Sequence, residues 1–236
     1  MQVGRVSELW RYPVKSMGGE LLDEAFVSWH GVEGDRRWAF VREGLIRSSF
    51  PWLTIRERPE LSHFRTWFTE PGRPDDSPTT VRTPEGEELD VADERLAERI
   101  GPGVHVIKQN RGIPDIAPLS LMTTATIGGL SGLAGRRLDS PRFRPNLLVE
   151  PIGDEPFPED GWVGSVLRIG ELRMRVDQRD KRCVMINIDP DTDERDAAVL
   201  RTVAQERDAC AGVYGSTVTP GRVAVGDAVV LEAGAA

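Results

Sequence analysis

The chain has 236 residues, of which 39% are hydrophobic, so it is long enough to bury one large core or two smaller ones, and disorder is not expected. Its formal net charge of −8 argues against a general binder of nucleic acids or of anionic membranes, because those surfaces attract basic proteins. We therefore expect any anionic ligand to be held by a local group of basic side chains.

Only two cysteines occur, Cys183 and Cys210, and nothing in the sequence requires a disulfide between them. Together with the lack of a recognisable signal peptide or apolar spanning stretch, this usage predicts a protein of the reducing cytoplasm. The three histidines show no zinc-ligand spacing, and no glycine-rich nucleotide motif or iron–sulfur cysteine cluster is present.

Short strands separated by glycine and proline turns dominate the first half of the chain. One helix is expected over residues 93–100, with Asp93 as its N-cap and Leu96, Ala97 and Ile100 on one face. The strands predicted in this half cover residues 4–12, 24–29, 38–41, 46–49, 61–68, 79–83, 88–91 and 104–107.

Two turns in this half carry side chains that suit an anion. The loop 14–19 combines Lys15 and Ser16 with two glycines, which let backbone amides approach a ligand. The turn 30–37 presents Arg36 beside Asp35, and arginine can grip a phosphate with two parallel hydrogen bonds. An ordinary turn and a surface ion pair are the alternative interpretations.

The second half adds a hydroxyl-rich segment and a stiff arginine turn. Thr123 or Thr124 is expected to cap a helix that runs to about residue 133, where N-terminal amides and hydroxyls suit an anion or serve only as the cap. Pro145 restricts the backbone that presents Arg144 and Asn146. The other elements expected are a turn at 159–164, a helix at 197–205, and strands at 147–149, 166–169, 172–177, 213–219 and 228–231.

The stretch 179–192 holds the residue with the most distinctive chemistry, Cys183. Its alternating pattern predicts a strand that ends before Pro190, with Cys183 facing away from the core beside Lys181 and Arg182. Basic neighbours favour the thiolate, which binds metals or attacks electrophiles, whereas a small buried hydrophobe is the alternative reading. The side chains expected in the core are Val184, Ile186 and Ile188.

Many short strands bent by glycine, with few short helices, predict a mostly β fold built from barrels rather than an open parallel sheet. No long linker or repeat separates the two halves. We expect two β-barrel domains, at residues 1–110 and 111–236.

Six motifs occur along the chain in a recognisable order. They are Tyr12-Pro-Val-Lys-Ser16, Gly34-Asp-Arg36, Arg142-Phe-Arg-Pro-Asn146, Glu159-Asp-Gly-Trp162, Arg182-Cys183 followed by Asp189-Pro-Asp-Thr192, and Val225-Gly-Asp227. In this order the motifs resemble those of MOSC proteins that carry the MOSC N-terminal β-barrel, a family that includes the mitochondrial amidoxime-reducing component and its bacterial relatives. The resemblance runs from about residue 3 to residue 231.

The resemblance implies a molybdenum–pyranopterin cofactor with Cys183 as the protein ligand of the metal, which a soft thiolate suits. Catalytic roles are implied for Cys183 and for Asp189, and the family is also associated with pyridoxal phosphate. The residues implied to hold the phosphate and the pterin are Lys15, Ser16, Arg36, Thr123, Thr124, Thr126, Arg144, Asn146 and Arg182. Two departures bear on the site, since the hydroxyl loop has threonines where relatives favour serine and Asp193 replaces a glycine.

By resemblance, the expected reaction is the two-electron reduction of an N–O bond in a hydroxylamine, hydroxamate or amidoxime, with the oxygen leaving as water. The alternative is a carrier that holds the cofactor, or sulfur as a Cys183 persulfide, without turnover. No motif for an electron-transfer cofactor is present, so we expect a separate ferredoxin-like or cytochrome-like donor that docks on a basic patch, and no nucleic acid or membrane partner.

Overall fold

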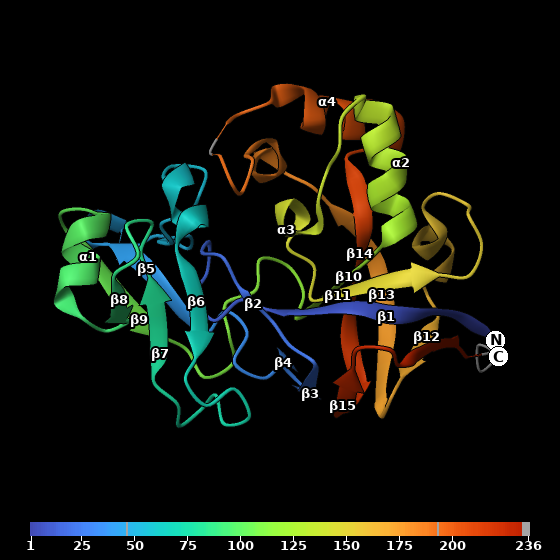
Figure 1. The fold of residues 1–236 in the computed structure, drawn as a ribbon, viewed down its shortest axis with the longest axis horizontal. Helices are drawn as coiled ribbons and strands as arrows, with labels where there is room; N and C mark the ends of the chain where they lie inside the picture. Colours follow the sequence, from blue (N-terminus) through green and yellow to red (C-terminus); the bar gives the residue numbers. More distant parts are fainter. Residues whose placement is uncertain (46, 193, 233–236) are drawn as a thin grey trace.

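A computed structural model describes residues 1–45, 47–192 and 194–232 of the chain. Two lobes of β structure lie side by side along the long axis of the molecule, and three of the four α-helices cover one side of the larger lobe (Figure 1). Two residues named in the sequence analysis lie outside the described residues. They are Ile46, in the strand predicted at 46–49, and Asp193, which replaces a glycine of the relatives.

The larger lobe is a closed barrel of seven strands. Its first strand, β1 (Gln2–Arg11), pairs antiparallel with both β11 (Leu147–Pro151) and β16 (Ala228–Leu231), so a strand from the start of the chain closes a barrel that otherwise comes from the second half. The remaining strands, in order from β11 to β16, are β10 (Leu119–Thr123), β14 (Cys210–Thr219), β13 (Leu172–Lys181) and β12 (Val166–Ile169).

Alternation along these strands fills the barrel. Leu9, Leu121, Leu147, Val176 and Val213 are fully buried in one cluster, as expected when every second side chain of a strand faces inward. The short strand β2 (Glu20–Leu21) extends β1 on the side of the smaller lobe.

The smaller lobe contains short sheets around its own apolar cluster, which includes Phe40, Leu61, Val81 and Leu96. Its elements are β5 (Trp38–Arg42) paired with β9 (Val104–Lys108), the sheet β6 (Arg65–Phe68), β7 (Thr79–Arg82) and β8 (Glu88–Asp90), helix α1 (Glu94–Ile100), and the 3₁₀ turns η1 (Glu43–Leu45) and η2 (Pro59–His63).

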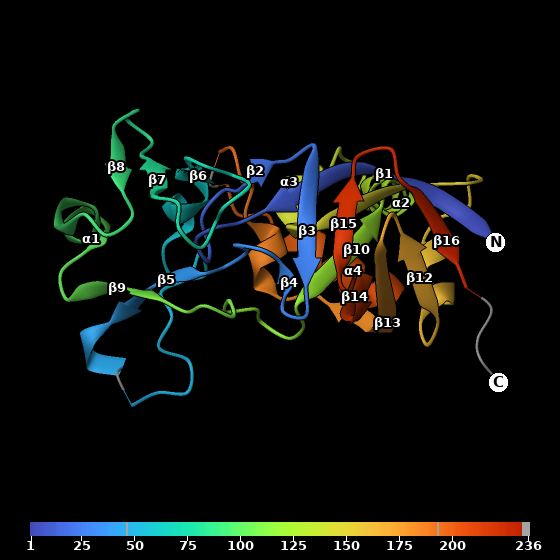
Figure 2. The ribbon, with the colours of Figure 1, turned by 90° about the horizontal axis from the view of Figure 1, so that it is seen from below.

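A third small sheet lies beside the barrel, as the view from below shows (Figure 2). It is made of β15 (Gly221–Ala224), β3 (Glu24–Ser28) and β4 (Gly31–Val32), so it again joins segments from opposite ends of the sequence. The two lobes are therefore interleaved along the chain.

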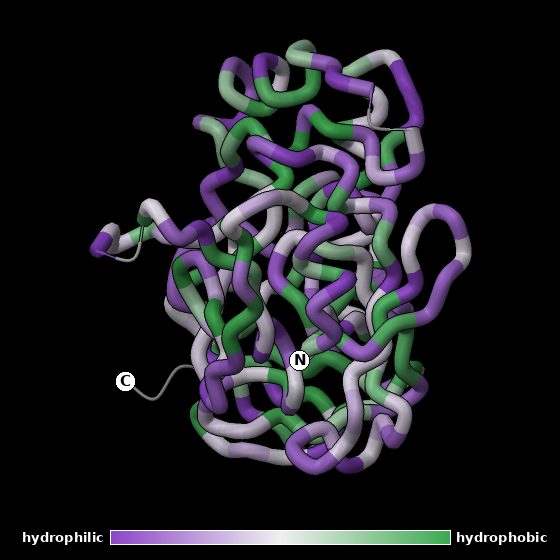
Figure 3. The backbone as a smooth tube through the Cα atoms, turned by 90° about the vertical axis from the view of Figure 1, so that its left-hand side faces the viewer, coloured by the Kyte–Doolittle hydropathy of each residue, from purple (hydrophilic) through white to green (hydrophobic). Residues whose placement is uncertain are grey.

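Helices pack outside the barrel on a third apolar cluster that includes Leu130, Ile186, Val199 and Val203. Hydrophobic and hydrophilic residues alternate in short runs along the chain (Figure 3). Within the described residues, no helix is long and apolar enough to span a membrane. The elements of this layer are α2 (Thr124–Ala134), α3 (Ser140–Phe143), α4 (Ala197–Arg207) and the 3₁₀ turns η3 (Pro158–Trp162) and η4 (Val184–Asn187).

The predicted class, a mostly β barrel fold with a few short helices, is confirmed. Helix capping was also predictable, because Asp93 and Thr123 accept hydrogen bonds from the backbone N–H groups of Arg95 and Thr126. These cap interactions are encoded within a few residues of sequence.

The strand predicted through Cys183 is wrong. Strand β13 ends at Lys181, and residues 184–187 form η4, in which the backbone N–H of Ile186 donates to Cys183 O at 3.2 Å. Since three residues make one turn of a 3₁₀ helix, alternate residues do not share a face, and the side chain of Val184, expected in the core, is exposed.

Two predicted strands in the smaller lobe also need correction. Pro59 starts the 3₁₀ turn η2, so the strand predicted over 61–68 is confined to β6. The segment 46–49 was predicted as a strand, but its described residues form turns and bends after η1.

Candidate functional site

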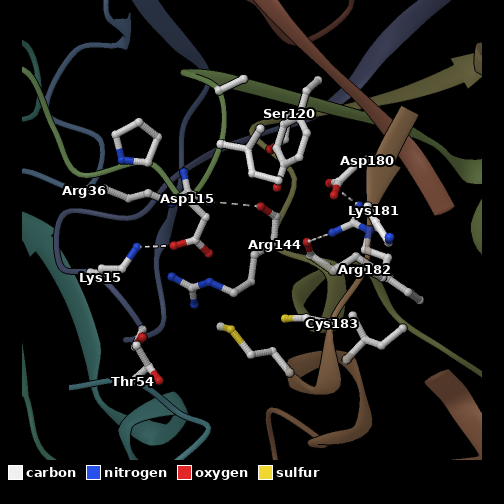
Figure 4. Close-up of a pocket in the computed structure, with 18 of the residues that line it drawn as sticks. Lys15, Arg36, Thr54, Asp115, Ser120, Arg144, Asp180, Lys181, Arg182 and Cys183 are labelled. Carbon is white, nitrogen blue, oxygen red and sulfur yellow. Dashed lines mark hydrogen bonds and ion pairs between the residues drawn. The ribbon is translucent and has the colours of Figure 1, made fainter. Parts of the chain in front are cut away.

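A cavity of about 260 Å³ is lined by residues of both lobes (Figure 4). The loop after β1, the turn after β4, the segment 50–56, the linker 114–117 and the residues that flank η4 contribute to its walls. The residues expected at the site from sequence that the structure brings together here are Lys15, Ser16, Arg36, Arg144, Asn146, Arg182 and Cys183.

Three of these residues have a left-handed backbone. Ser16, Arg36 and Arg144 have φ values of 69°, 50° and 54°, and they are half of the six non-glycine residues with positive φ in the described chain. Such a conformation costs roughly 1–3 kcal/mol per residue and persists where the surrounding structure imposes it, which is common at binding sites. The strain here turns two guanidinium groups and a hydroxyl toward one cavity.

Two arginines lie against the ring of Tyr12, which is buried. The guanidinium carbons of Arg36 and Arg144 are 5.1 Å and 4.2 Å from the ring centroid, distances that suit cation–π attraction. Arg36 also forms an ion pair with Asp35, whose other oxygen accepts from the backbone N–H of Tyr12 at 2.8 Å. Burial acts to lower the pKa of Arg36, but the Asp35 carboxylate raises it.

Arg144 has no carboxylate partner among the described residues, and its Nη1 donates to the carbonyl of Met17 at 2.6 Å. Burial lowers the pKa of Arg144 to about 10, so the guanidinium stays charged at neutral pH. Its charge is therefore the one in this cluster that is left without a neutralising partner.

Lys15 completes the cation cluster from the smaller-lobe side. Its Nζ donates to the carbonyl of Ile113 at 3.1 Å and forms an ion pair with Asp115. Burial lowers the pKa of Lys15, while Asp115 opposes this effect. The ammonium group is thus held in place by the linker that joins β9 to β10.

Several buried polar atoms on the cavity walls lack a hydrogen-bond partner among the described residues. Those of Asp180 and Arg182 belong to an ion pair, whereas Ser16 Oγ, Thr54 Oγ1 and Arg144 Nη2 have no ion-pair partner in the described chain either. A buried polar group without a partner is costly, and natural proteins leave few of them. A polar, anionic ligand seated beside Lys15, Arg36 and Arg144 would satisfy such atoms, so these residues fit the phosphate and pterin of the implied cofactor.

Cys183 lies at the start of η4, on the wall of the same cavity, and is partly buried. Its Sγ accepts a hydrogen bond from Nη2 of Arg56, at 3.3 Å, and the Arg56 guanidinium lies 5.6 Å from the ring of Phe50. A guanidinium donor stabilises negative charge on sulfur, which suits a thiolate ligand for a metal. Cys210, by contrast, does not line the cavity, and its thiol faces the carbonyl of Asp208.

Arg182 supports the turn that carries Cys183. Its Nε and Nη1 donate to the carbonyls of Ala211 and Phe143 at 2.7 Å and 2.8 Å, and its Nη2 lies 2.8 Å from the carboxylate of Asp180. Two guanidinium nitrogens are thus hydrogen-bonded to backbone carbonyls, and the third is ion-paired with Asp180. The side chain orients the cavity wall, and it has less capacity to bind an anion than Arg144.

Asp189 does not line the cavity. Its carboxylate pairs with Arg142 and accepts from the backbone N–H groups of Asp191 and Thr192, at 3.0 Å and 3.2 Å. Burial acts to raise the pKa of Asp189, but these hydrogen bonds and Arg142 lower it. Because Arg142 also donates to the carbonyl of Ile186, the pair ties the Asp-Pro-Asp-Thr loop to η4.

The threonine loop lies outside the cavity as well. Thr123 and Thr126 are fully buried, and the hydroxyl of Thr123 donates to Glu159 at 2.8 Å while accepting from the backbone N–H of Thr126. Thr124, the first residue of α2, lines a separate surface hollow beside Trp10. For Thr123 the structure therefore shows the capping role that was the alternative interpretation of these hydroxyls.

Asn146 lines the cavity, but its side chain is also part of the framework. Its Oδ1 accepts from the backbone N–H and the hydroxyl of Ser120, both at 3.2 Å. The cavity residues that the sequence did not single out include Thr54, Arg56, Asp115, Ser120, Asp180 and Tyr214. Most come from loops or lie outside the motifs, so spacing alone gave no signal for them.

Two family descriptions together match nearly the whole chain. The MOSC domain matches residues 108–230, and the MOSC N-terminal beta barrel domain matches residues 3–110. The chain belongs to the MOSC family. The strands of the large barrel other than β1 lie in the part that matches the MOSC domain or at its C-terminal end, while β1 comes from the part that matches the N-terminal domain, and both parts line the cavity.

Curated relatives of this MOSC protein include mitochondrial amidoxime reducing component 2 of Bos taurus, which is 26% identical over 247 residues that cover 81% of this chain and 68% of the relative. Mitochondrial amidoxime-reducing component 1 of Homo sapiens is 24% identical over 291 residues, covering 98% of this chain and 83% of the relative. Molybdenum cofactor sulfurase 2 of Culex quinquefasciatus is 43% identical over 65 residues, 28% of this chain and 8% of that protein.

A solved structure shares the fold over almost the full length. The YUAD protein from Bacillus subtilis superposes with a TM-score of 0.53 at 11% sequence identity, covering 96% of this chain and 94% of that one. At this identity the likeness concerns the arrangement of strands and not the chemistry of the site.

Proposed function

We propose that this MOSC protein is a molybdenum-cofactor-dependent oxidoreductase that reduces the N–O bond of N-hydroxylated compounds. The observation that carries the proposal is the shared cavity: a partly buried thiol held by Arg56 and a cluster of buried cations open onto the same space. The distant relationship to amidoxime-reducing components supports the class of substrate.

The cavity residues fit the implied cofactor by charge and by donor type. Lys15, Ser16, Arg36 and Arg144 offer cationic and hydroxyl groups for its phosphate and pterin, and Cys183 offers a soft sulfur donor for the metal. When bound, the cofactor supplies a metal centre that exchanges two electrons with the substrate. Arg182 and Asn146 act from the wall, because their polar groups are already engaged in orienting backbone segments.

The chain itself contributes orientation and electrostatics. Arg56 places a positively charged hydrogen-bond donor against Sγ of Cys183, and the Arg142–Asp189 pair fixes η4 relative to the following loop. The apolar side chains of Phe50 and Ile116 also line the cavity, although both are exposed. Asp189 is thus a positioning residue in this proposal.

Reduction of an N-hydroxylated amine consumes two electrons and two protons and releases water and the amine. The sequence has no motif for a second redox group, so we propose that the electrons come from a separate ferredoxin-like or cytochrome-like protein. The two cysteines are free, which agrees with a reducing compartment such as the cytoplasm.

Elemental analysis and an activity assay test the proposal. Protein made in cells that synthesise the cofactor should contain molybdenum, and it should reduce a hydroxylamine or benzamidoxime when a chemical reductant is supplied, but not with NADH alone. Turnover with NADH and no other protein would mean that a further redox group is present. Full molybdenum loading with no turnover under any reductant would refute the reductase and support a carrier of the cofactor or of Cys183-bound sulfur.

A further inference from the structure

Asp115 lies inside the cation cluster as its internal counter-ion. The residue belongs to the irregular linker between β9 and β10, and its side chain points toward Lys15 with Arg144 nearby (Figure 4). Burial acts to raise the pKa of Asp115, but Lys15 and then Arg36 lower it, so the carboxylate is ionised at neutral pH. It therefore occupies a position that suits an incoming anion.

The two partners of this ion pair differ in how firmly they are held. The side chain of Lys15 is 6% exposed and is anchored by the carbonyl of Ile113, whereas the side chain of Asp115 is 43% exposed. Within the described residues, the carboxylate of Asp115 accepts a single hydrogen bond, from Lys15. Because the Asp115 side chain is partly exposed and has this one partner, it is free to turn toward solvent while Lys15 stays anchored to Ile113.

Displacement of Asp115 changes the charge that a ligand meets. Arg36 is neutralised by Asp35 and Lys15 by Asp115, which leaves Arg144 as the unbalanced cation of the cluster. Once Asp115 leaves, Lys15 and Arg144 both face the ligand without a carboxylate partner. Two unbalanced positive charges match a dianion, such as a phosphate monoester above its second ionisation.

We propose that Asp115 is a displaceable counter-ion that reserves this site for phosphate-type dianions. A dianion replaces the carboxylate on Lys15 and also neutralises Arg144, whereas a monoanion gains too little to do both. The inference deepens the proposed function at its cofactor site and rests on it for the identity of the natural anion. The binding of a simple anion is measurable whether or not the chain is a reductase.

Calorimetric titration of the full chain, purified from cells that do not make the cofactor, tests the proposal with inorganic phosphate, sulfate and nitrate as probes at pH 8. Wild-type protein should bind phosphate and sulfate but not nitrate. Asp115→Asn should bind phosphate about tenfold more tightly, because a like charge at contact distance no longer competes. Asp76→Asn is the matched control, since it removes the same charge from an exposed pair with Arg73, and its affinity should equal that of the wild type.

Lys15→Met should abolish the gain when combined with Asp115→Asn, which places the probe on Lys15. Asp115→Ala is the second variant. The amide of Asp115→Asn can still accept a hydrogen bond from Lys15, whereas alanine cannot. Phosphate affinity that is unchanged or weaker in both Asp115 variants would overturn the proposal, and so would nitrate binding to the wild type as tightly as phosphate. These binding measurements do not depend on reductase activity, so a failure of the proposed function would not change them.

Discussion

The two cysteines differ in what surrounds each sulfur, and this difference separates their roles. Cys183 receives a hydrogen bond from Arg56 and lines the cavity, while Cys210 faces a backbone carbonyl outside it. A thiolate is stabilised by a guanidinium donor and not by a carbonyl oxygen. The chemistry of the proposed site should therefore depend on one of the two sulfurs.

Replacing Cys183 by Ser should lower activity by at least about 100-fold, because a hydroxyl is a poor substitute for a soft metal ligand. The matched variant Cys210→Ser should retain activity and molybdenum content. Elemental analysis, the visible absorption spectrum and the rate with a chemical reductant give the comparison. Equal losses from both variants would contradict the assignment of Cys183.

Arg144 should contribute to cofactor retention through its charge, since it lacks a carboxylate partner and leaves Nη2 unsatisfied. Arg144→Ala should lose bound molybdenum severalfold faster during gel filtration. Glycine adopts the φ of 54° at this position without strain, so Arg144→Gly removes the side chain but keeps the backbone, and it should lose molybdenum equally fast. The control is Arg137→Ala, whose wild-type side chain is 88% exposed and lies outside the cavity lining. Retention by the Arg144 variants equal to that of the control would remove this residue from the binding site.

The start of α2 depends on a carboxylate carried by another element. Glu159, in η3, is fully buried and accepts from both the backbone N–H and the hydroxyl of Thr123. Burial raises the pKa of Glu159, although hydrogen bonds from Thr126 and Thr123 act to lower it. The folded state therefore binds a proton at this site more tightly than the unfolded chain does.

Stability should consequently rise, relative to Glu159→Gln, as the pH falls through the raised folded-state pKa toward the unfolded value of about 4.3. The contribution is lost as the pH rises, because the buried group must ionise in the fold. Urea unfolding of the two proteins, at several pH values from 7 to 4.5, measures the difference in free energy of unfolding. A difference that stays constant over this range, or shrinks at low pH, would contradict the prediction.

Features set by neighbouring residues could be predicted from the sequence. The strand alternation of the barrel and the caps at Asp93 and Thr123 each depend on a few adjacent side chains, and they are confirmed. The strand predicted through Cys183 failed because the 3₁₀ turn η4 buries Ile186, and the extended residue after it buries Ile188, as well as a strand would. Hydrophobicity alone does not distinguish these two conformations in so short a segment.

The cavity was predictable only in part, for a related reason. Lys15, Arg36 and Cys183 stand in motifs, so their sequence context indicated a shared site. Arg56 and Asp115 reach the same cavity because two lobes pack together, and that packing depends on contacts between distant segments. For Thr123 the sequence left two uses open, a helix cap or a ligand for an anion, and the structure shows the cap.

Strand β1, from the start of the chain, completes a barrel whose other strands come from the second half, and Gly4 lies where β1 pairs with β11. A Cβ atom at Gly4 would come within 2.6 Å of Glu150 O and 2.7 Å of Val149 Cγ1, so β1 approaches β11 too closely for any other residue. Glycine here lets the first strand of the chain complete the barrel.

Gly4→Ala should therefore lower the free energy of unfolding by about 1–3 kcal/mol through overpacking. Gly44→Ala provides the control, because a Cβ atom at that position meets no atom within 4 Å, and its effect should stay within about 0.5 kcal/mol. Urea denaturation of both variants measures the two values. If Gly44→Ala lowered the free energy of unfolding as much as Gly4→Ala, the close approach of β1 to β11 would not explain the loss of stability.

Closure of the barrel by β1 also affects how the protein is made. During translation β1 leaves the ribosome well before its partners, since Arg5 must wait for Glu150, 145 residues later, and Gln2 waits for Val230 in β16. Until then the edges of β1 stay open to pairing with other chains. Contacts between such distant residues slow folding and lengthen exposure to aggregation. We expect the nascent chain to need chaperone protection until β16 has emerged, and the barrel to form as a late, single event.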